Sequence, residues 1–159
     1  MNICIVVYSI TGHTLSVATK LQEKLTAAGH AVTMERLETT GPAGLSGEHS
    51  PLKNRPAVDA YDGLVFGSPV RGGTLPPPVA SYLNQLTSLD GKQVACLVTG
   101  FFPVAGWGRE QVIAQMSQIC TSKGATICAT GSVGWFSLNR RKQISQVVDQ
   151  LSEAFSETS

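Results

Sequence analysis

Short apolar runs alternate along the chain with longer segments in which apolar residues recur every three or four positions. Continuous runs predict buried strands, whereas the wider spacing predicts amphipathic helices. Four such runs are predicted as strands: residues 3–8, 64–67, 93–99 and 126–130. Residues 31–37 alternate apolar and polar positions, which predicts a fifth strand nearer the edge of the sheet. Four segments are predicted as helices: residues 13–28, 76–86, 110–122 and 140–155. Strands and helices that alternate in this way predict a parallel sheet covered by helices on both faces, with right-handed crossovers.

The chain shows no repeat, no linker and no change of composition, so residues 1–159 are expected to form one domain. One segment departs from the alternating pattern. Residues 38–57 are polar, contain several Gly and Pro, and lack a helical period where a crossover helix is expected. Long loops in compact domains are usually functional or poorly ordered. We therefore expect the helix there to be short or missing and the segment to lie near a ligand.

Charge and cysteine usage narrow the function classes. Charged residues make up 14% of the chain and nearly cancel, to a formal net charge of +1. Nucleic-acid partners require clustered Lys and Arg, so none is expected. The four cysteines (Cys4, Cys96, Cys120 and Cys128) lie in apolar segments and lack the spacing of a disulfide framework or a metal site. We therefore expect buried free thiols, which are typical of a reducing compartment. There is no signal-peptide pattern and no bilayer-length apolar stretch, which predicts a soluble, cytoplasmic protein without membrane contact.

Small hydroxyl residues and glycines gather after three of the predicted strands. In doubly wound sheets, ligands bind beyond the carboxyl ends of the strands, where the strand order reverses. The first loop is Ser9-Ile10-Thr11-Gly12-His13-Thr14, which leads directly into a helix whose N-terminal N–H groups attract anions. The loops after the third and fourth strands are Gly67-Ser68-Pro69-Val70-Arg71-Gly72-Gly73-Thr74 and Thr99-Gly100-Phe101-Phe102-Pro103.

The first loop contains neither Lys nor Arg, and this limits its ligand. A nucleotide hydrolase needs Gly-Lys-Ser/Thr there, and a dinucleotide site needs Gly-x-Gly-x-x-Gly. A phospho-accepting receiver domain would carry acidic residues where Tyr8 and Ser9 stand. A terminal monophosphate held by neutral donors fits the loop better. The alternative is that Thr11 or Thr14 merely satisfies backbone donors at the start of the helix.

The first loop resembles the Thr/Ser-x-Thr-Gly-x-Thr phosphate loop of flavodoxins. The segment 59–69, Asp-Ala-Tyr-Asp-Gly-Leu-Val-Phe-Gly-Ser-Pro, resembles the stretch that leads into their second flavin loop. The resemblance implies a flavodoxin-like α/β three-layer sandwich, with five parallel strands in the order 2-1-3-4-5, and FMN as cofactor. It places the FMN phosphate on Ser9, Ile10, Thr11, Gly12, His13 and Thr14. It places the flavin ring near Ser68, Pro69, Val70, Arg71, Gly72, Thr99, Gly100, Phe101, Trp107 and Gly108.

The second loop bears on the kind of redox protein. Val70-Arg71-Gly72, followed by another glycine and by prolines, resembles the NAD(P)H:quinone oxidoreductases of this superfamily more than its acidic electron carriers. The resemblance implies electron transfer with a redox partner protein, or NAD(P)H-dependent reduction of a quinone-type acceptor. The related enzymes are tetrameric, so a homo-oligomer stays open. The flavin carries the redox chemistry, so no catalytic dyad is required. The non-redox alternative is a module that binds another phosphate-bearing ligand or a protein partner.

Several single residues have two interpretations. Arg71 and Arg109 are expected either to attract a pyridine nucleotide or the reduced flavin, or to be solvated surface arginines. The aromatic rings of Phe101, Phe102 and Trp107 could stack on a flavin or fill the loop's own core. Trp135 is expected to pack near the end of the last strand. The imidazole of His13 is expected to matter less than its main chain, and His30 and His49 are expected to be exposed.

Overall fold

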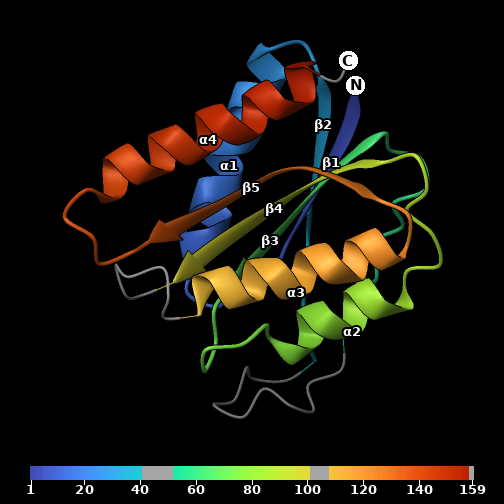
Figure 1. Ribbon diagram of the computed structural model, residues 1–159, viewed down its shortest axis with the longest axis horizontal. Coiled ribbons are helices and arrows are strands. Elements are labelled where there is room, and N and C mark those ends of the chain that lie inside the picture. The colour runs from blue at the N-terminus through green and yellow to red at the C-terminus, as the bar shows by residue number, and fades with distance from the viewer. Residues whose placement is uncertain (41–51, 101–107, 158–159) are drawn as a thin grey trace.

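The computed structural model describes residues 1–40, 52–100 and 108–157 (Figure 1). Phe101, Phe102, Trp107 and His49 lie outside these ranges. Five parallel strands form one sheet: β1 (Asn2–Val7), β2 (Ala31–Arg36), β3 (Gly63–Pro69), β4 (Gln93–Gly100) and β5 (Thr126–Gly134). Their order is β2-β1-β3-β4-β5, which confirms the topology that the resemblance implies.

Helices cover both faces of the sheet, as Figure 1 shows. The helices α1 (His13–Ala27) and α4 (Arg140–Glu157) pack on one face, and α2 (Pro77–Gln85) and α3 (Arg109–Ser122) pack on the other. The alternation of side chains along β1 divides its residues between two cores. Ile3, Ile5 and Val7 pack with α1 and α4, whereas Cys4 and Val6 pack with α2 and α3. Such burial on both faces explains the continuous apolar run of the first strand.

The last strand is longer than the sequence predicts, because residues 131–134 pair with residues 97–100 of β4 although they carry few apolar side chains. Gly131 also leaves room for α4, since a Cβ there would lie 2.6 Å from Val147 Cγ1. The prediction for His30 is wrong. Its side chain is buried, and Nδ1 lies 3.0 Å from the Met1 amino nitrogen.

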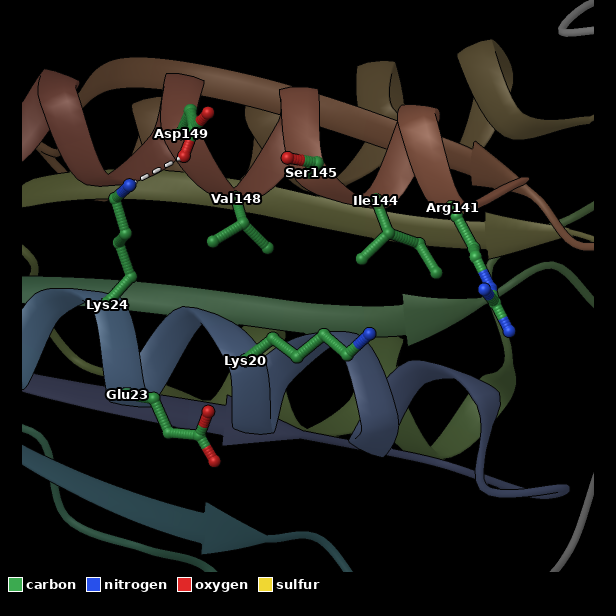
Figure 2. Close-up of a pocket in the computed structure, with 8 residues that line it drawn as sticks. All are labelled: Lys20, Glu23, Lys24, Arg141, Ile144, Ser145, Val148 and Asp149. Atoms are coloured by element: carbon green, nitrogen blue, oxygen red, sulfur yellow. Dashed lines mark ion pairs between the residues drawn. The ribbon is translucent and has the colours of Figure 1, made fainter. Parts of the chain in front are cut away.

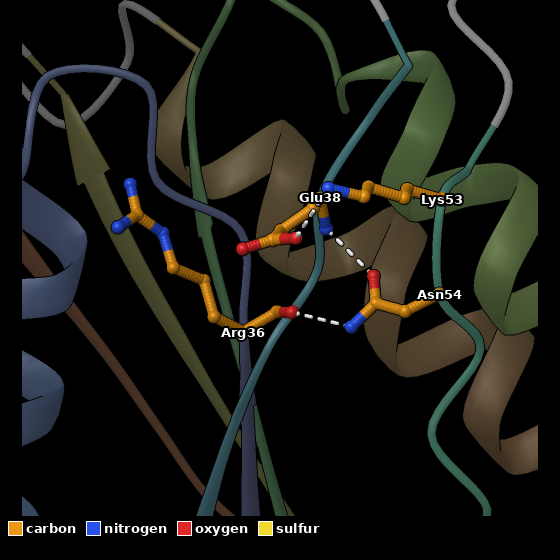
Figure 3. Close-up of polar contacts among 4 residues, drawn as sticks. All are labelled: Arg36, Glu38, Lys53 and Asn54. Carbon is orange, nitrogen blue, oxygen red and sulfur yellow. Dashed lines mark hydrogen bonds and ion pairs between the residues drawn. The ribbon is translucent and has the colours of Figure 1, made fainter.

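Residues 38–40 and 52–57, the described parts of the polar segment, contain no helix. Instead, the chain returns antiparallel beside the end of β2, where Thr39 and Leu52 form a bridge. Figure 3 shows that the Asn54 side chain fastens this return: its Oδ1 accepts the N–H of Glu38 at 2.8 Å, and its Nδ2 donates to the carbonyl of Arg36 at 2.7 Å. The segment is thereby held at the carboxyl end of the sheet.

Side-chain amides also reach the other edge strand. Gln150 of α4 donates from Nε2 to the carbonyl of Thr130 at 3.3 Å. The Oε1 of Gln143 accepts the N–H of Gly134 at 3.0 Å. These contacts add to the apolar packing of α4 on β5.

A hollow of about 470 Å³ lies between α1 and α4 (Figure 2). An exposed ion pair between Lys24 and Asp149, 2.8 Å long, links the two helices there. Ile144 and Val148 line the hollow from α4. No helix in the described ranges combines the length and the hydropathy needed to span a membrane.

Candidate functional site

The loop between β1 and α1 leaves backbone donors available. Ser9 is buried, and its Oγ accepts the N–H groups of Gly12 at 3.0 Å and Leu15 at 3.4 Å. Gly12 has a φ of 91°, which lets the chain turn directly into α1. No described residue accepts a hydrogen bond from the N–H of Ile10, Thr11 or Thr14. These donors stand at the positive end of a helix, and this donor set fits a phosphate group.

A buried hydroxyl pair forms the floor beneath this loop. The Oγ1 atoms of Thr14 and Thr99 lie 2.7 Å apart, and both side chains are buried. Gly67 of β3 lies against Thr14, since a Cβ there would be 3.3 Å from its methyl group. The hydrogen bond ties the first loop to the end of β4. The Thr14 hydroxyl therefore contributes to the floor of the site, whereas its backbone N–H remains available.

The loop after β3 is a tight hairpin. The N–H groups of Arg71 and Thr74 donate to each other's carbonyls, both at 3.1 Å. The φ angles of Gly72 and Gly73 are 58° and 75°, as the central residues of a type I′ turn require. A side chain at either position would be strained. The glycines therefore allow a sharp turn whose main chain is accessible to a ligand.

This hairpin packs against the loop after β4. The N–H of Val70 donates to the carbonyl of Thr99 at 2.9 Å. Gly108 lies so close that a Cβ there would be 2.9 Å from Val70 Cγ1 and 3.0 Å from the Cα of Gly73. The resemblance assigns both of these segments to the flavin ring. The hairpin contacts the second segment at Thr99, where that segment begins, and at Gly108, where it ends.

The described candidate residues differ in accessibility. Ile10, Thr11 and Gly72 are exposed, whereas Gly12, His13, Pro69, Val70, Arg71 and Gly100 are half-buried, and Ser9, Thr14, Ser68, Thr99 and Gly108 are buried. The hydroxyl of Ser68 donates to the carbonyl of Pro69 at 2.9 Å. The accessible part of the site is thus made largely of main chain, with few side-chain functional groups.

The two arginines named from sequence have different surroundings. Arg109 is 5% exposed, and its aliphatic part fills the space beside Gly100, where a Cβ would lie 2.9 Å from Arg109 Cγ. Its Nη1 lies 3.4 Å from Ser132 Oγ, and burial lowers the pKa of Arg109. Its interpretation as a solvated surface residue is therefore wrong. Arg71 is half-buried, and its positive charge counteracts the rise that burial causes in the pKa of Tyr8.

Trp135 contributes to this edge in a way that the sequence did not predict. Its ring stacks on the His13 imidazole, with ring centres 4.0 Å apart and planes at 12°. The backbone N–H of Trp135 donates to the carbonyl of Gly100 at 2.7 Å. The guanidinium carbon of Arg140 lies 4.8 Å from the indole centre. Burial and the positive charge of Arg140 lower the pKa of His13. An aromatic residue directly after the fifth strand was the only available signal.

Arg36 is a second residue that the sequence analysis missed. It ends β2 opposite Val7 of β1, and its Nη2 donates to the carbonyl of Ser9 at 3.3 Å. Figure 3 shows its side chain extending away from Asn54 and from the ion pair of Lys53 and Glu38. A hollow of about 410 Å³ lies here, lined by Ser9, Ile10, Arg36, Glu38 and Lys53 among others. A basic residue at the end of the strand that neighbours β1 was the signal.

The described ranges contain neither a candidate metal site nor a reactive thiolate. They contain no group of three or more His, Cys, Asp or Glu residues that could hold a metal ion. The four cysteines are free thiols. Burial raises the pKa of Cys4 and Cys96 to about 11 and that of Cys120 to about 12, which keeps these thiols protonated.

Comparisons with known proteins agree with this architecture. The family model "Flavodoxin domain" matches residues 4–118. Flavodoxin 2 from Bacillus cereus superposes with a TM-score of 0.70 at 22% identity, over 100% of both chains. The chain is 29% identical to a Synechocystis protein named diflavin flavoprotein A 3 over 112 residues, 70% of this chain and 17% of that protein. It is 27% identical to the NAD(P)H dehydrogenase (quinone) of Gluconacetobacter diazotrophicus over 95 residues, 55% of this chain and 48% of that protein.

A parallel sheet in the order 2-1-3-4-5, with a phosphate-type loop between β1 and α1, defines a flavodoxin-like α/β protein. The family match covers more than half of the chain, and the chain therefore belongs to the flavodoxin domain family, a family of FMN-binding redox proteins. The match spans about one sixth of the length of the two diflavin flavoproteins and about half of the length of the two quinone dehydrogenases.

Proposed function

We propose that the chain binds FMN at the carboxyl edge of its sheet and transfers electrons through the bound flavin. The phosphate lies in the loop of residues 9–14, and the ring lies against the hairpin of residues 68–73 and the loop that begins at Thr99. The observation that carries the proposal is the set of backbone N–H groups of Ile10, Thr11 and Thr14, for which no described residue is an acceptor. The buried bond between Thr14 and Thr99 fixes these donors in place.

The residues of the chain would bind and tune the cofactor, while FMN supplies reversible electron acceptance. The N-terminus of α1 stabilises the phosphate with its dipole. The main chain of Gly72 and Gly73 approaches the ring without a side chain between them. The positive charge of Arg71 favours a reduced, anionic flavin over the oxidised one. The loops of residues 9–14, 67–75, 99–108 and 134–142 contain no Asp or Glu that would oppose this charge.

NAD(P)H-dependent reduction of quinone-type acceptors is the second candidate function. Two relatives are named NAD(P)H dehydrogenase (quinone), and each matches over 95 residues of this chain. Arg36 and Arg71 provide cations near the phosphate loop that suit the phosphates of a pyridine nucleotide. Bound FMN would supply the redox chemistry of this scheme, because it can accept a hydride from NAD(P)H and pass two electrons with two protons to a quinone. As an electron carrier, the chain would instead receive its electrons from another protein.

An anaerobic titration separates the two candidates. The apoprotein should bind FMN with quenching of flavin fluorescence, and a lack of saturable binding would remove the proposal. The holoprotein is then mixed with NADPH or NADH without oxygen, and the flavin absorbance is followed. Rapid bleaching identifies a pyridine-nucleotide enzyme. A flavin that dithionite reduces but neither nucleotide reduces identifies a carrier. A size measurement on the same sample tests whether the chain forms a homo-oligomer.

We also propose that the chain is a single domain and works in the cytoplasm. One sheet and its two helical layers include all described helices and strands, which supports the single domain. Four free cysteines, three of them buried, support a reducing compartment.

A further inference from the structure

The segment from Phe136 to Lys142 places apolar and basic side chains together on the surface. Leu138 is fully exposed, and Phe136 is 69% exposed. Arg141 and Lys142, on the first turn of α4, are also exposed. This segment borders a hollow of about 540 Å³ that it lines together with Trp135. We refer to residues 136–142 as the basic-apolar rim.

The charge of the rim is not balanced by nearby residues of the sequence. No acidic residue lies between Glu110 and Asp149, and the first acidic residue of α1 is Glu23. Arg141 also lines the hollow between α1 and α4, where Figure 2 shows Lys20 extending along the same groove. Residues 136–142 carry three basic side chains, those of Arg140, Arg141 and Lys142, and no acidic one.

The rim adjoins both loops of the proposed flavin site. The ring of Trp135, the residue before it, stacks on His13 of the phosphate loop, and the backbone N–H of Trp135 donates to the Gly100 carbonyl. The guanidinium of Arg140 in the rim lies over the same indole, with its central carbon 4.8 Å from the ring centre, and its Nη1 donates to the Trp135 carbonyl at 3.2 Å. A protein seated on the rim would therefore lie next to the site through which electrons enter or leave.

We propose that the basic-apolar rim is the docking surface for a redox partner protein whose contact face carries acidic residues around an apolar centre. Leu138 and Phe136 supply the desolvated centre, and Arg141 and Lys142 pair with the acidic residues at its border. Such an arrangement gives specificity and fast association, because complementary charges steer the encounter and apolar contacts hold the complex. The proposal relies on the proposed function only for the electron exchange that follows docking.

An acidic protein fits the rim better than an anionic membrane. Membrane-surface helices bury a long apolar face in the lipid. The apolar residues of α4, Ile144, Val147, Val148, Leu151 and Phe155, are instead buried against the sheet. The exposed apolar side chains of the rim are confined to one short loop, and Asp149 follows on the same helix. Such a small patch matches a transient protein contact.

The test uses an acidic plant-type [2Fe–2S] ferredoxin as probe. Binding is followed as changes in the amide NMR resonances of the labelled chain, with and without FMN, and electron transfer as flavin reduction after rapid mixing with reduced ferredoxin. We expect the largest resonance changes at residues 136–142. Lys142→Glu and Leu138→Ser should each slow electron transfer at low salt by about fivefold or more. Lys123→Glu at the end of α3 changes the net charge equally and should have little effect.

The outcomes decide between defined alternatives. No saturable binding of ferredoxin, or equal loss of rate in Lys142→Glu and Lys123→Glu, would overturn the proposal. Binding of the chain to vesicles with anionic phosphatidylserine, abolished by Lys142→Glu, would overturn it in favour of a membrane surface. Rim resonance changes in a chain that fails to bind FMN would support docking while removing the proposed flavin function. Unchanged FMN affinity in the rim variants is required in every supporting case.

Discussion

The imidazole of His13 lies flat against the indole of Trp135, at 4.0 Å between ring centres. This stack joins the loop of residues 9–14 to the end of β5, and it holds an ionisable side chain of that loop against an aromatic ring. Burial and Arg140 both lower the pKa of His13. The ring is therefore kept neutral in the protein at pH values where an unfolded chain would begin to protonate it.

The titration of His13 tests this arrangement. Its proton NMR signals should titrate with a pKa below the ordinary value of 6.5, and Trp135→Ala should raise that pKa by exposing the ring. Arg140→Gln should raise it as well, because a positive charge is removed. Binding of FMN or of inorganic phosphate, both anionic, should also raise it. A pKa that responds to neither substitution would show that the stack does not control the ionisation.

The lowered pKa of His13 also determines how the stability of the fold changes with pH. Because the pKa of His13 is lowered in the folded state, the unfolded chain binds more protons as the pH falls below 6.5. The contribution of His13 to stability is therefore complete above that pH and is lost as the pH decreases toward the folded-state pKa. Urea unfolding of His13→Gln should show a weaker dependence on pH between 7.5 and 5 than the unchanged chain.

Gly12 and Gly29 form a matched pair for testing the phosphate loop. They have φ angles of 91° and 99°, and no heavy atom lies within 4 Å of a Cβ at either position. Alanine at either site should cost about 1–2 kcal/mol of unfolding free energy, from backbone strain alone. Only Gly12→Ala should weaken FMN binding, because only Gly12 lies in the loop. Calorimetry and urea unfolding measure the two effects, and equal FMN affinities would exclude the loop as the phosphate site.

The hydroxyl pair of Thr14 and Thr99 should behave as a coupled unit. Thr14→Val leaves the Thr99 hydroxyl buried without its partner, at a cost of about 1–3 kcal/mol. The double variant Thr14→Val/Thr99→Val should be more stable than the sum of the single changes predicts, since no unpaired hydroxyl remains. Additive changes in unfolding free energy would show that the pair contributes nothing as a pair.

Arg71 is expected to act on the flavin by its charge. Arg71→Ala should lower the midpoint potential of the bound flavin and weaken FMN binding by about fivefold, the effect of a partly solvated charge. Arg55→Ala removes the same charge from an exposed position and should leave both quantities unchanged. Spectroelectrochemistry gives the potential. Identical values for the two variants would remove the role of Arg71.

The sequence predicted the sheet well because its strands are buried on both faces, so their apolar runs, such as that of β1, stand out. The prediction ended β5 too early, since residues 131–134 are held in the sheet by pairing with β4 and by contact with α4, which local pattern cannot reveal. His30 was misjudged for the same reason, as tertiary packing buries it.

The candidate site was predictable where it depends on local chain geometry and unpredictable where it depends on contacts between distant segments. The glycines at positions 12, 72 and 73 mark turns that only glycine makes easily. The stack of His13 on Trp135 and the contact of Arg36 with Ser9 join residues far apart in sequence. Sequence spacing carries no information about such contacts.

The side-chain amides at the two edges of the sheet have a consequence for the behaviour of the chain in concentrated solution. An open β-sheet can recruit a strand from another molecule through unpaired main-chain groups, which is how edge-to-edge aggregates grow. Asn54 occupies two such groups at the end of β2, and Gln143 and Gln150 occupy two on β5. The fold thus shields parts of both outer strands with neutral side chains, and so limits self-association without adding charge to the edge where we propose that the flavin binds.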